Sequence, residues 1–145
     1  MGVDEERQPE GVLAREVKQV IVINRGLSRS MPRGKEIAQG SHAAMAWLSE
    51  RLEFLTGPSG MGVAQFSDAE RAWLTGAFTK AVVQAPGTPE LQQLHEDAIA
   101  AGLEAHLITD AGRTVFHGEP TITALAIGPD YAEKIDKITG HLKLY

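Results

Sequence analysis

The sequence contains no cysteine, and this absence excludes several kinds of chemistry at once. Without thiols there can be no disulfide bridge, no thiolate zinc site and no cysteine nucleophile. Residues 1–16 also lack an apolar run, so we expect a solvated polar arm there rather than a signal peptide or a membrane anchor. Together these absences favour a cytoplasmic protein with no membrane partner. Five acids lie in the arm: Asp4, Glu5, Glu6, Glu10 and Glu16.

The charge is acidic overall but basic in one segment. A net charge of −5 argues against a protein that coats nucleic acid through many phosphate contacts, so no DNA partner is expected. Residues 17–35, however, contain no acid at all. A short basic run is often only a solvated loop, but this one leads into a helix and could equally form a phosphate-binding face. Its positive residues are Lys18, Arg25, Arg29, Arg33 and Lys35.

The chain of 145 residues has the length of one domain, which we place at residues 17–145. Apolar β-branched runs predict strands, whereas capping signals and apolar periodicity predict helices. The expected strands are 17–23, 78–84, 105–109 and 121–127, and the expected helices are about 33–52, 67–74, 88–102 and 130–138.

The order of these elements predicts an α/β fold with a mixed sheet. Strands and helices largely alternate, which favours a sheet with helices on both faces. Only eleven residues, 110–120, separate the third and fourth strands, and they show no helical period. Because a parallel crossover needs a dozen or more residues, the fourth strand should run antiparallel.

The helix that begins near residue 33 has an unusual first turn. It carries Lys35 at a position where the helix dipole favours an acid. We therefore expect an interaction outside the helix to offset the unfavourable electrostatic energy of the lysine. A helix start is also a natural anion site. Three polar side chains share one face of the helix: Lys35, Gln39 and His42. Three apolar residues lie on the opposite face and are expected to pack on the core: Ile37, Ala44 and Leu48.

A second polar segment follows the third strand, with the sequence Asp-Ala-Gly-Arg-Thr at residues 110–114. Such a segment is ordinarily just a turn. In open α/β sheets, however, ligands bind beyond the carboxyl ends of the strands. Asp110 and the Lys35 helix both follow strands, so the sequence predicts that they meet at one edge of the sheet and form a site.

These motifs, taken together, resemble the peptidyl-tRNA hydrolase 2 family over residues 17–145. The shared features, in order, are Gly-Lys-x-x-Ala-Gln-x-x-His-Ala at 34–43, Trp73, Gly76 and Lys80 before the second strand, the 110–114 segment, Ala-Ile-Gly-Pro at 126–129 and the segment 135–145. The resemblance implies a three-layer α/β/α fold on a mixed, mostly parallel four-stranded sheet. It also implies a homodimer that hydrolyses the ester of peptidyl-tRNA.

Residue types suggest roles within such a reaction, which needs a water nucleophile and stabilisation of an oxyanion. Lys35 and Gln39 are candidates for the oxyanion, and Thr114 for positioning water or substrate. Asp110 should stay ionised beside cations, and it could orient water, deprotonate it or simply hold Lys35. His42 is either a general base or a structural histidine, so the identity of the base stays open. Four arginines are expected to contact tRNA: Arg25, Arg29, Arg33 and Arg113.

No metal or other cofactor is expected, because the remaining histidines show no paired ligand spacing. They are His95, His106, His117 and His141. Two departures from the family stand out: the polar arm has no counterpart, and residues 52–71 form a longer segment, which we interpret as a surface insertion rather than a lid. The alternatives are a non-catalytic tRNA- or protein-binding module and an esterase or amidase for small molecules. The retained polar set argues against the first, and the basic stretch against the second.

Overall fold

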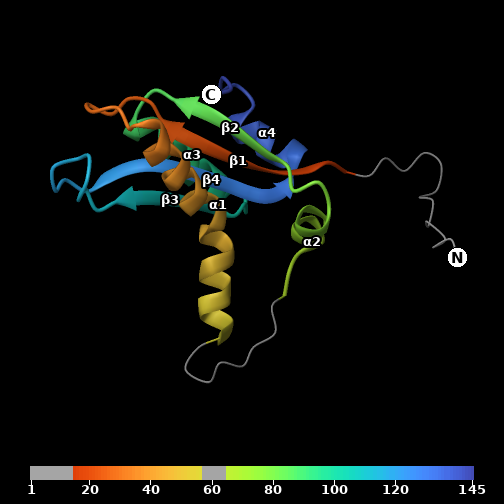
Figure 1. Cartoon of the computed structure of the whole chain (residues 1–145). Coiled ribbons are helices and arrows are strands. Elements are labelled where there is room, and N and C mark those ends of the chain that lie inside the picture. The colour runs from red at the N-terminus through yellow and green to blue at the C-terminus, as the bar shows by residue number, and fades with distance from the viewer. Residues whose placement is uncertain (1–14, 57–64) are drawn as a thin grey trace, which may run out of the picture.

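The structure is a computed structural model that describes residues 15–56 and 65–145 (Figure 1). The polar arm expected at 1–16 lies almost entirely outside these residues, as does the middle of the expected insertion. The division into an arm and one domain therefore stays a prediction. Within the described residues, no helix is long and apolar enough to cross a membrane.

All the expected elements occur in the described part of the chain. They are β1 (Val17–Asn24), α1 (Arg33–Thr56), α2 (Asp68–Thr75), β2 (Lys80–Ala85), α3 (Thr88–Ala100), β3 (Ala105–Asp110), β4 (Thr121–Tyr131) and α4 (Ala132–Thr139). The two largest differences are at the ends of α1 and β4, each of which continues four residues past its expected end. Strand β4 extends past residue 127 because Lys18 and Val17 of β1 pair with Asp130 and Tyr131. Helix α4 starts later for the same reason.

The sheet has the order β2-β1-β4-β3 and is mixed, as expected. Strand β4 is antiparallel to both β1 and β3, which confirms the argument from the short 110–120 connection. Only the β1–β2 pairing is parallel, and the other two pairings are antiparallel. The expectation of a mostly parallel sheet was therefore wrong for the pairings between strands. Because β1 and β3 each oppose β4, strands β1, β2 and β3 nevertheless end at the same edge.

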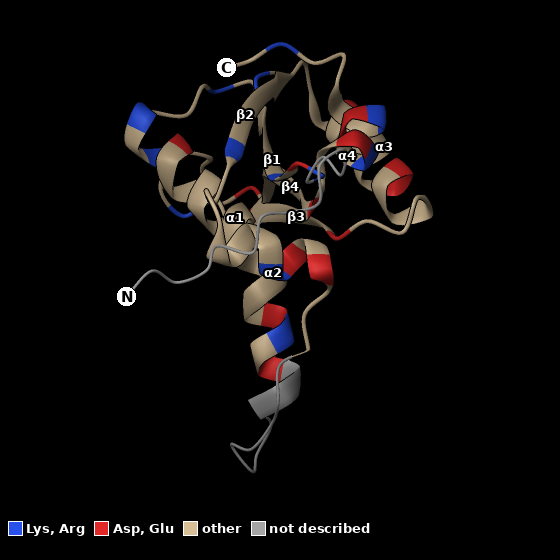
Figure 2. Ribbon diagram, turned by 90° about the vertical axis from the view of Figure 1, so that its right-hand side faces the viewer, with Lys and Arg blue, Asp and Glu red and all other residues tan. Residues whose placement is uncertain are grey.

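Strand β1 sends alternate side chains into two separate clusters, as the two-residue period of a strand requires. Val20 and Val22 join a core with α3 and α4, and Ile21 and Ile23 join a core with α1. Figure 1 shows α1 on one face of the sheet and α3 and α4 on the other. Figure 2 shows basic residues together with one acid, Glu36, at the start of α1, whereas the Lys, Arg, Asp and Glu positions of α3 are all acidic.

The face of α1 that packs on the sheet differs from the one that its apolar pattern indicated. Ile37 was expected in the core but is 65% exposed, so this prediction was wrong. Gly40 and Ala43 face the sheet instead, and a Cβ atom on Gly40 would be in van der Waals contact with Ile21 Cγ2, at 3.7 Å. Small residues let the helix approach closely, and this closeness decides the buried face. Ala44 is partly buried against the core, as expected.

Candidate active site

Lys35 and Asp110 meet at the sheet edge where β1 and β3 end. Lys35 Nζ donates a hydrogen bond of 2.8 Å to Asp110 Oδ1, and both side chains are mostly buried. Lys35 Nζ also donates to Thr114 Oγ1 at 3.0 Å. The structure therefore brings together three residues that the sequence placed in one site. The carboxylate also offsets the unfavourable position of a cation at the start of a helix.

The loop after β3 fixes the second oxygen of the carboxylate. The backbone N–H of Gly112 donates to Asp110 Oδ2 at 2.9 Å. Gly112 has φ +83°, and a Cβ atom there would lie 2.4 Å from Glu119 O, so only glycine fits this turn. The hydrogen bond from Lys35 lowers the pKa of Asp110, and the Gly112 N–H acts in the same direction. Asp110 is therefore ionised at neutral pH, which makes it a weak base and a strong anchor for Lys35.

Gln39 lies one turn further along α1 and is only 4% exposed. Its Nε2 points to Asp110 Oδ1 at 3.4 Å, and its Oε1 accepts a 2.5 Å hydrogen bond from Thr123 Oγ1. Thr123 is buried in β4 and was missed in the sequence. The sequence did contain a signal for Thr123, namely a hydroxyl group within an apolar strand. A polar group that is buried there needs a hydrogen-bond partner. Thr123 fixes the direction of the Gln39 amide so that its N–H groups face the carboxylate.

His42 is exposed on α1, which argues against the structural alternative for this histidine. It lies close enough to Asp110 to be the smallest of the contributions that lower the pKa of that carboxyl group. Its imidazole is thus available to solvent beside the Lys35–Asp110 pair.

The four predicted tRNA-binding arginines are all exposed but have different surroundings. Arg25 donates to the Tyr145 hydroxyl at 2.6 Å, and Arg29 contacts the His117 ring in the loop after β3. Arg33 lines a cavity between α1 and β2. Arg113 lies in the same loop as Thr114.

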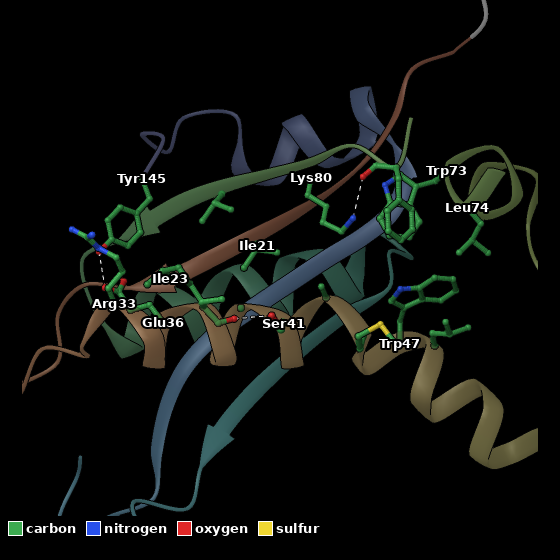
Figure 3. Close-up of a pocket in the computed structure, with 17 residues that line it drawn as sticks. Ile21, Ile23, Arg33, Glu36, Ser41, Trp47, Trp73, Leu74, Lys80 and Tyr145 are labelled. Carbon is green, nitrogen blue, oxygen red and sulfur yellow. Dashed lines mark hydrogen bonds between the residues drawn. The ribbon is translucent and has the colours of Figure 1, made fainter. Parts of the chain in front are cut away.

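That cavity has a volume of about 790 Å³ and lies between α1 and β2 (Figure 3). Lys35 and Asp110 do not line it. We call it the α1–β2 groove, and its walls include the exposed apolar residues Ile37, Met45, Phe78, Val82 and Tyr145. Exposed apolar surface that is gathered in one place marks an interaction site more often than a chance feature.

A metal centre has no support in the described part of the chain, where no group of three or more His, Cys, Asp or Glu side chains is placed to hold an ion.

Comparison with known proteins gives a consistent result. The family model described as "Peptidyl-tRNA hydrolase PTH2" matches residues 17–145. The peptidyl-tRNA hydrolase of Methanocaldococcus jannaschii is 39% identical over 130 residues, which cover 88% of this chain and 99% of the relative. That of Sulfurisphaera tokodaii is 38% identical over 88% of this chain and 97% of its own length. Bovine "Peptidyl-tRNA hydrolase 2, mitochondrial" is 38% identical over 90% of this chain and 65% of its own length.

Proposed function

The chain belongs to the peptidyl-tRNA hydrolase PTH2 family, and from this membership we infer that it hydrolyses the ester bond of peptidyl-tRNA, releasing the peptide and free tRNA. The observation that carries the proposal is the cluster of Lys35, Asp110 and Thr114 at the edge where β1 and β3 end. A non-catalytic binding module would not need an ionised carboxylate to orient a lysine in this way.

Lys35 is our candidate for stabilising the oxyanion. An ammonium group has three N–H donors, and Asp110 and Thr114 accept from two of them. The third can point to the carbonyl oxygen of the ester, where negative charge develops as water attacks the carbon. When the tetrahedral intermediate collapses, the bond to the ribose oxygen breaks and that oxygen takes up a proton.

The other polar residues support this step in different ways. Asp110 holds Lys35, and Gln39 and Thr123 hold Asp110 from the buried side. The exposed imidazole of His42 is our candidate for taking a proton from the attacking water, a role that histidine fills more often than any other residue. Arg25, Arg29, Arg33 and Arg113 are proposed to bind tRNA phosphates, as is expected for exposed guanidinium groups near a phosphate-rich substrate.

The direct test is to incubate the purified protein with N-acetylaminoacyl-tRNA and to measure release of the N-acetylated amino acid. We expect multiple turnovers without added metal beyond the magnesium that keeps the tRNA folded. Lys35→Ala, purified in the same way, controls for contaminating hydrolases. Binding of tRNA without release would favour the binding module instead, and activity lost with EDTA and restored by zinc would contradict the metal-free mechanism.

We also propose that the protein is a homodimer whose copies meet through the α1–β2 groove. Twofold symmetry requires one patch to complement itself. Glu36 and Lys80 lie toward opposite ends of the groove (Figure 3), so a twofold axis through its middle would bring the lysine of each copy near the glutamate of the other. Such a pairing would give Glu36 Oε2, which is buried without a hydrogen bond and lies 3.7 Å from Arg25 NH1, a closer cationic partner. Lys80 Nζ donates to Phe78 O at 3.1 Å, and its ammonium group has two further N–H donors.

A charge placed in this groove should therefore separate the copies. Ile37→Glu is expected to weaken dimerisation by about a hundredfold, the scale of an interface hot spot, as measured by sedimentation equilibrium. The control is Ile99→Glu, which alters a comparably exposed isoleucine on α3, outside the groove. A parent protein that stays monomeric at high concentration, or equal effects of both substitutions, would overturn this interface.

Three further features are proposals of the same kind. Helices on both faces of the sheet support the three-layer α/β/α arrangement. The cytoplasmic location and the absence of a DNA partner stay predictions.

A further inference from the structure

Residues 143–145 lie along β2 and fix the position of the Tyr145 ring. The backbone N–H of Gln84 donates to Lys143 O at 3.0 Å, and the N–H of Tyr145 donates to Val82 O at 3.0 Å. Leu144 forms an antiparallel bridge with Val83 between these two hydrogen bonds. The aromatic ring therefore projects from a well-defined backbone at the end of the α1–β2 groove, near Arg33 and Glu36 (Figure 3).

The hydroxyl of Tyr145 links two charged residues from different elements. It donates to Glu36 Oε1 at 2.8 Å and accepts from Arg25 NH1 at 2.6 Å. Glu36 directly follows Lys35 in the first turn of α1, and Arg25 directly follows β1. The hydrogen bond to the Glu36 carboxylate raises the pKa of Tyr145, so the phenol is neutral and keeps its proton for this bond.

Without the hydroxyl, this arrangement of charges would change. Arg25 NH1 lies within ion-pair distance of Glu36 Oε2, at 3.7 Å, but too far for a hydrogen bond, which a small movement would allow it to form. The Tyr145 ring also lies against the guanidinium, with Arg25 Cζ 4.6 Å from the ring centroid. The phenol thus takes the hydrogen bond that Arg25 would otherwise donate directly to the carboxylate, and the remaining N–H groups of this half-exposed side chain stay available.

We propose that Tyr145 is a positioning residue for the substrate: it orients Arg25 so that the guanidinium can bind a phosphate of the tRNA acceptor end. This inference rests on the proposed function. It explains why Arg25, which was predicted to bind a phosphate, donates a hydrogen bond to Tyr145 and yet remains open to solvent. Through Glu36, the same hydroxyl connects this contact to the helix turn that carries Lys35.

The test is Tyr145→Phe, which keeps the ring and the backbone pairing and removes only the hydroxyl. We expect KM for N-acetylaminoacyl-tRNA to rise about tenfold with little change in kcat, as is typical of a lost charge-assisted hydrogen bond. Direct tRNA binding should show a salt dependence that is shallower by about one phosphate contact. In Arg25→Ala the same substitution should add little, because the two residues act as a unit.

Tyr131→Phe is the matched control, since it removes the hydroxyl of the other tyrosine, which lies at the end of β4. Thermal unfolding and sedimentation of each variant separate the positioning effect from lost stability or lost dimerisation. If Tyr145→Phe binds tRNA with the parent affinity and salt dependence, this proposal is overturned while the proposed function stands. A parent protein that binds tRNA without hydrolysing it overturns the proposed function alone, and one that binds no tRNA overturns both.

Discussion

Lys35→Ala is expected to reduce kcat for N-acetylaminoacyl-tRNA hydrolysis by about a hundredfold or more, the loss typical of removing an oxyanion donor. The ammonium group is held by Asp110 Oδ1 at 2.8 Å and by Thr114 Oγ1 at 3.0 Å, so its direction is fixed before substrate arrives. Alanine removes the charge and the orientation together. Lys137→Ala, at an exposed lysine in the last turn of α4, provides the control and should retain parent activity.

Asp110→Ala should cause a loss of similar size, because the lysine then has no carboxylate to orient it. The double variant is expected to lose much less than the product of the two single losses, since groups that act as a unit are not additive. Both residues lie at an edge of the sheet rather than in either core cluster, so circular dichroism should be unchanged. Single variants that turn over substrate at the parent rate would end the catalytic assignment.

The largest effect on stability is expected for Glu70→Ala, with a loss of about 3 kcal/mol in the free energy of unfolding. Glu70 is 5% exposed and forms two hydrogen bonds with Arg51, at 2.6 and 2.8 Å. It also accepts from the backbone N–H of Ser67, which completes the capping box of α2. Alanine leaves a largely buried guanidinium with fewer partners and removes part of the helix cap.

Chemical denaturation measures this loss directly, and thermal unfolding should show a midpoint lower by about 10 °C for a chain of this size. The matched control is Asp68→Ala in the same turn of α2. Its carboxylate is exposed and lies 3.6 Å from Arg71, so its removal should cost less than about 1 kcal/mol. Equal losses in the two variants would show that the Arg51–Glu70 pair contributes no more than a surface ion pair.

Local signals in the sequence determined most of the secondary structure and the antiparallel direction of β4. Ser67 and Glu70 predicted the start of α2 because a capping box needs only residues three apart. The short 110–120 connection was enough to predict an antiparallel β4, since chain length limits the possible crossovers. The Lys35–Asp110 contact was also foreseen, because strands that run in one direction end at one edge of the sheet.

The tertiary structure decided what depends on close approach between distant segments. The apolar pattern of α1 predicted the partial burial of Ala44 but not the exposure of Ile37, because Gly40 and Ala43 are the residues that pack on the sheet. Pairings such as Thr123 with Gln39, and Tyr145 with Arg25, join residues 84 and 120 positions apart. Periodicity and capping report on neighbours within a few residues, whereas these contacts exist only once the sheet has placed β4, α1 and residues 143–145 together.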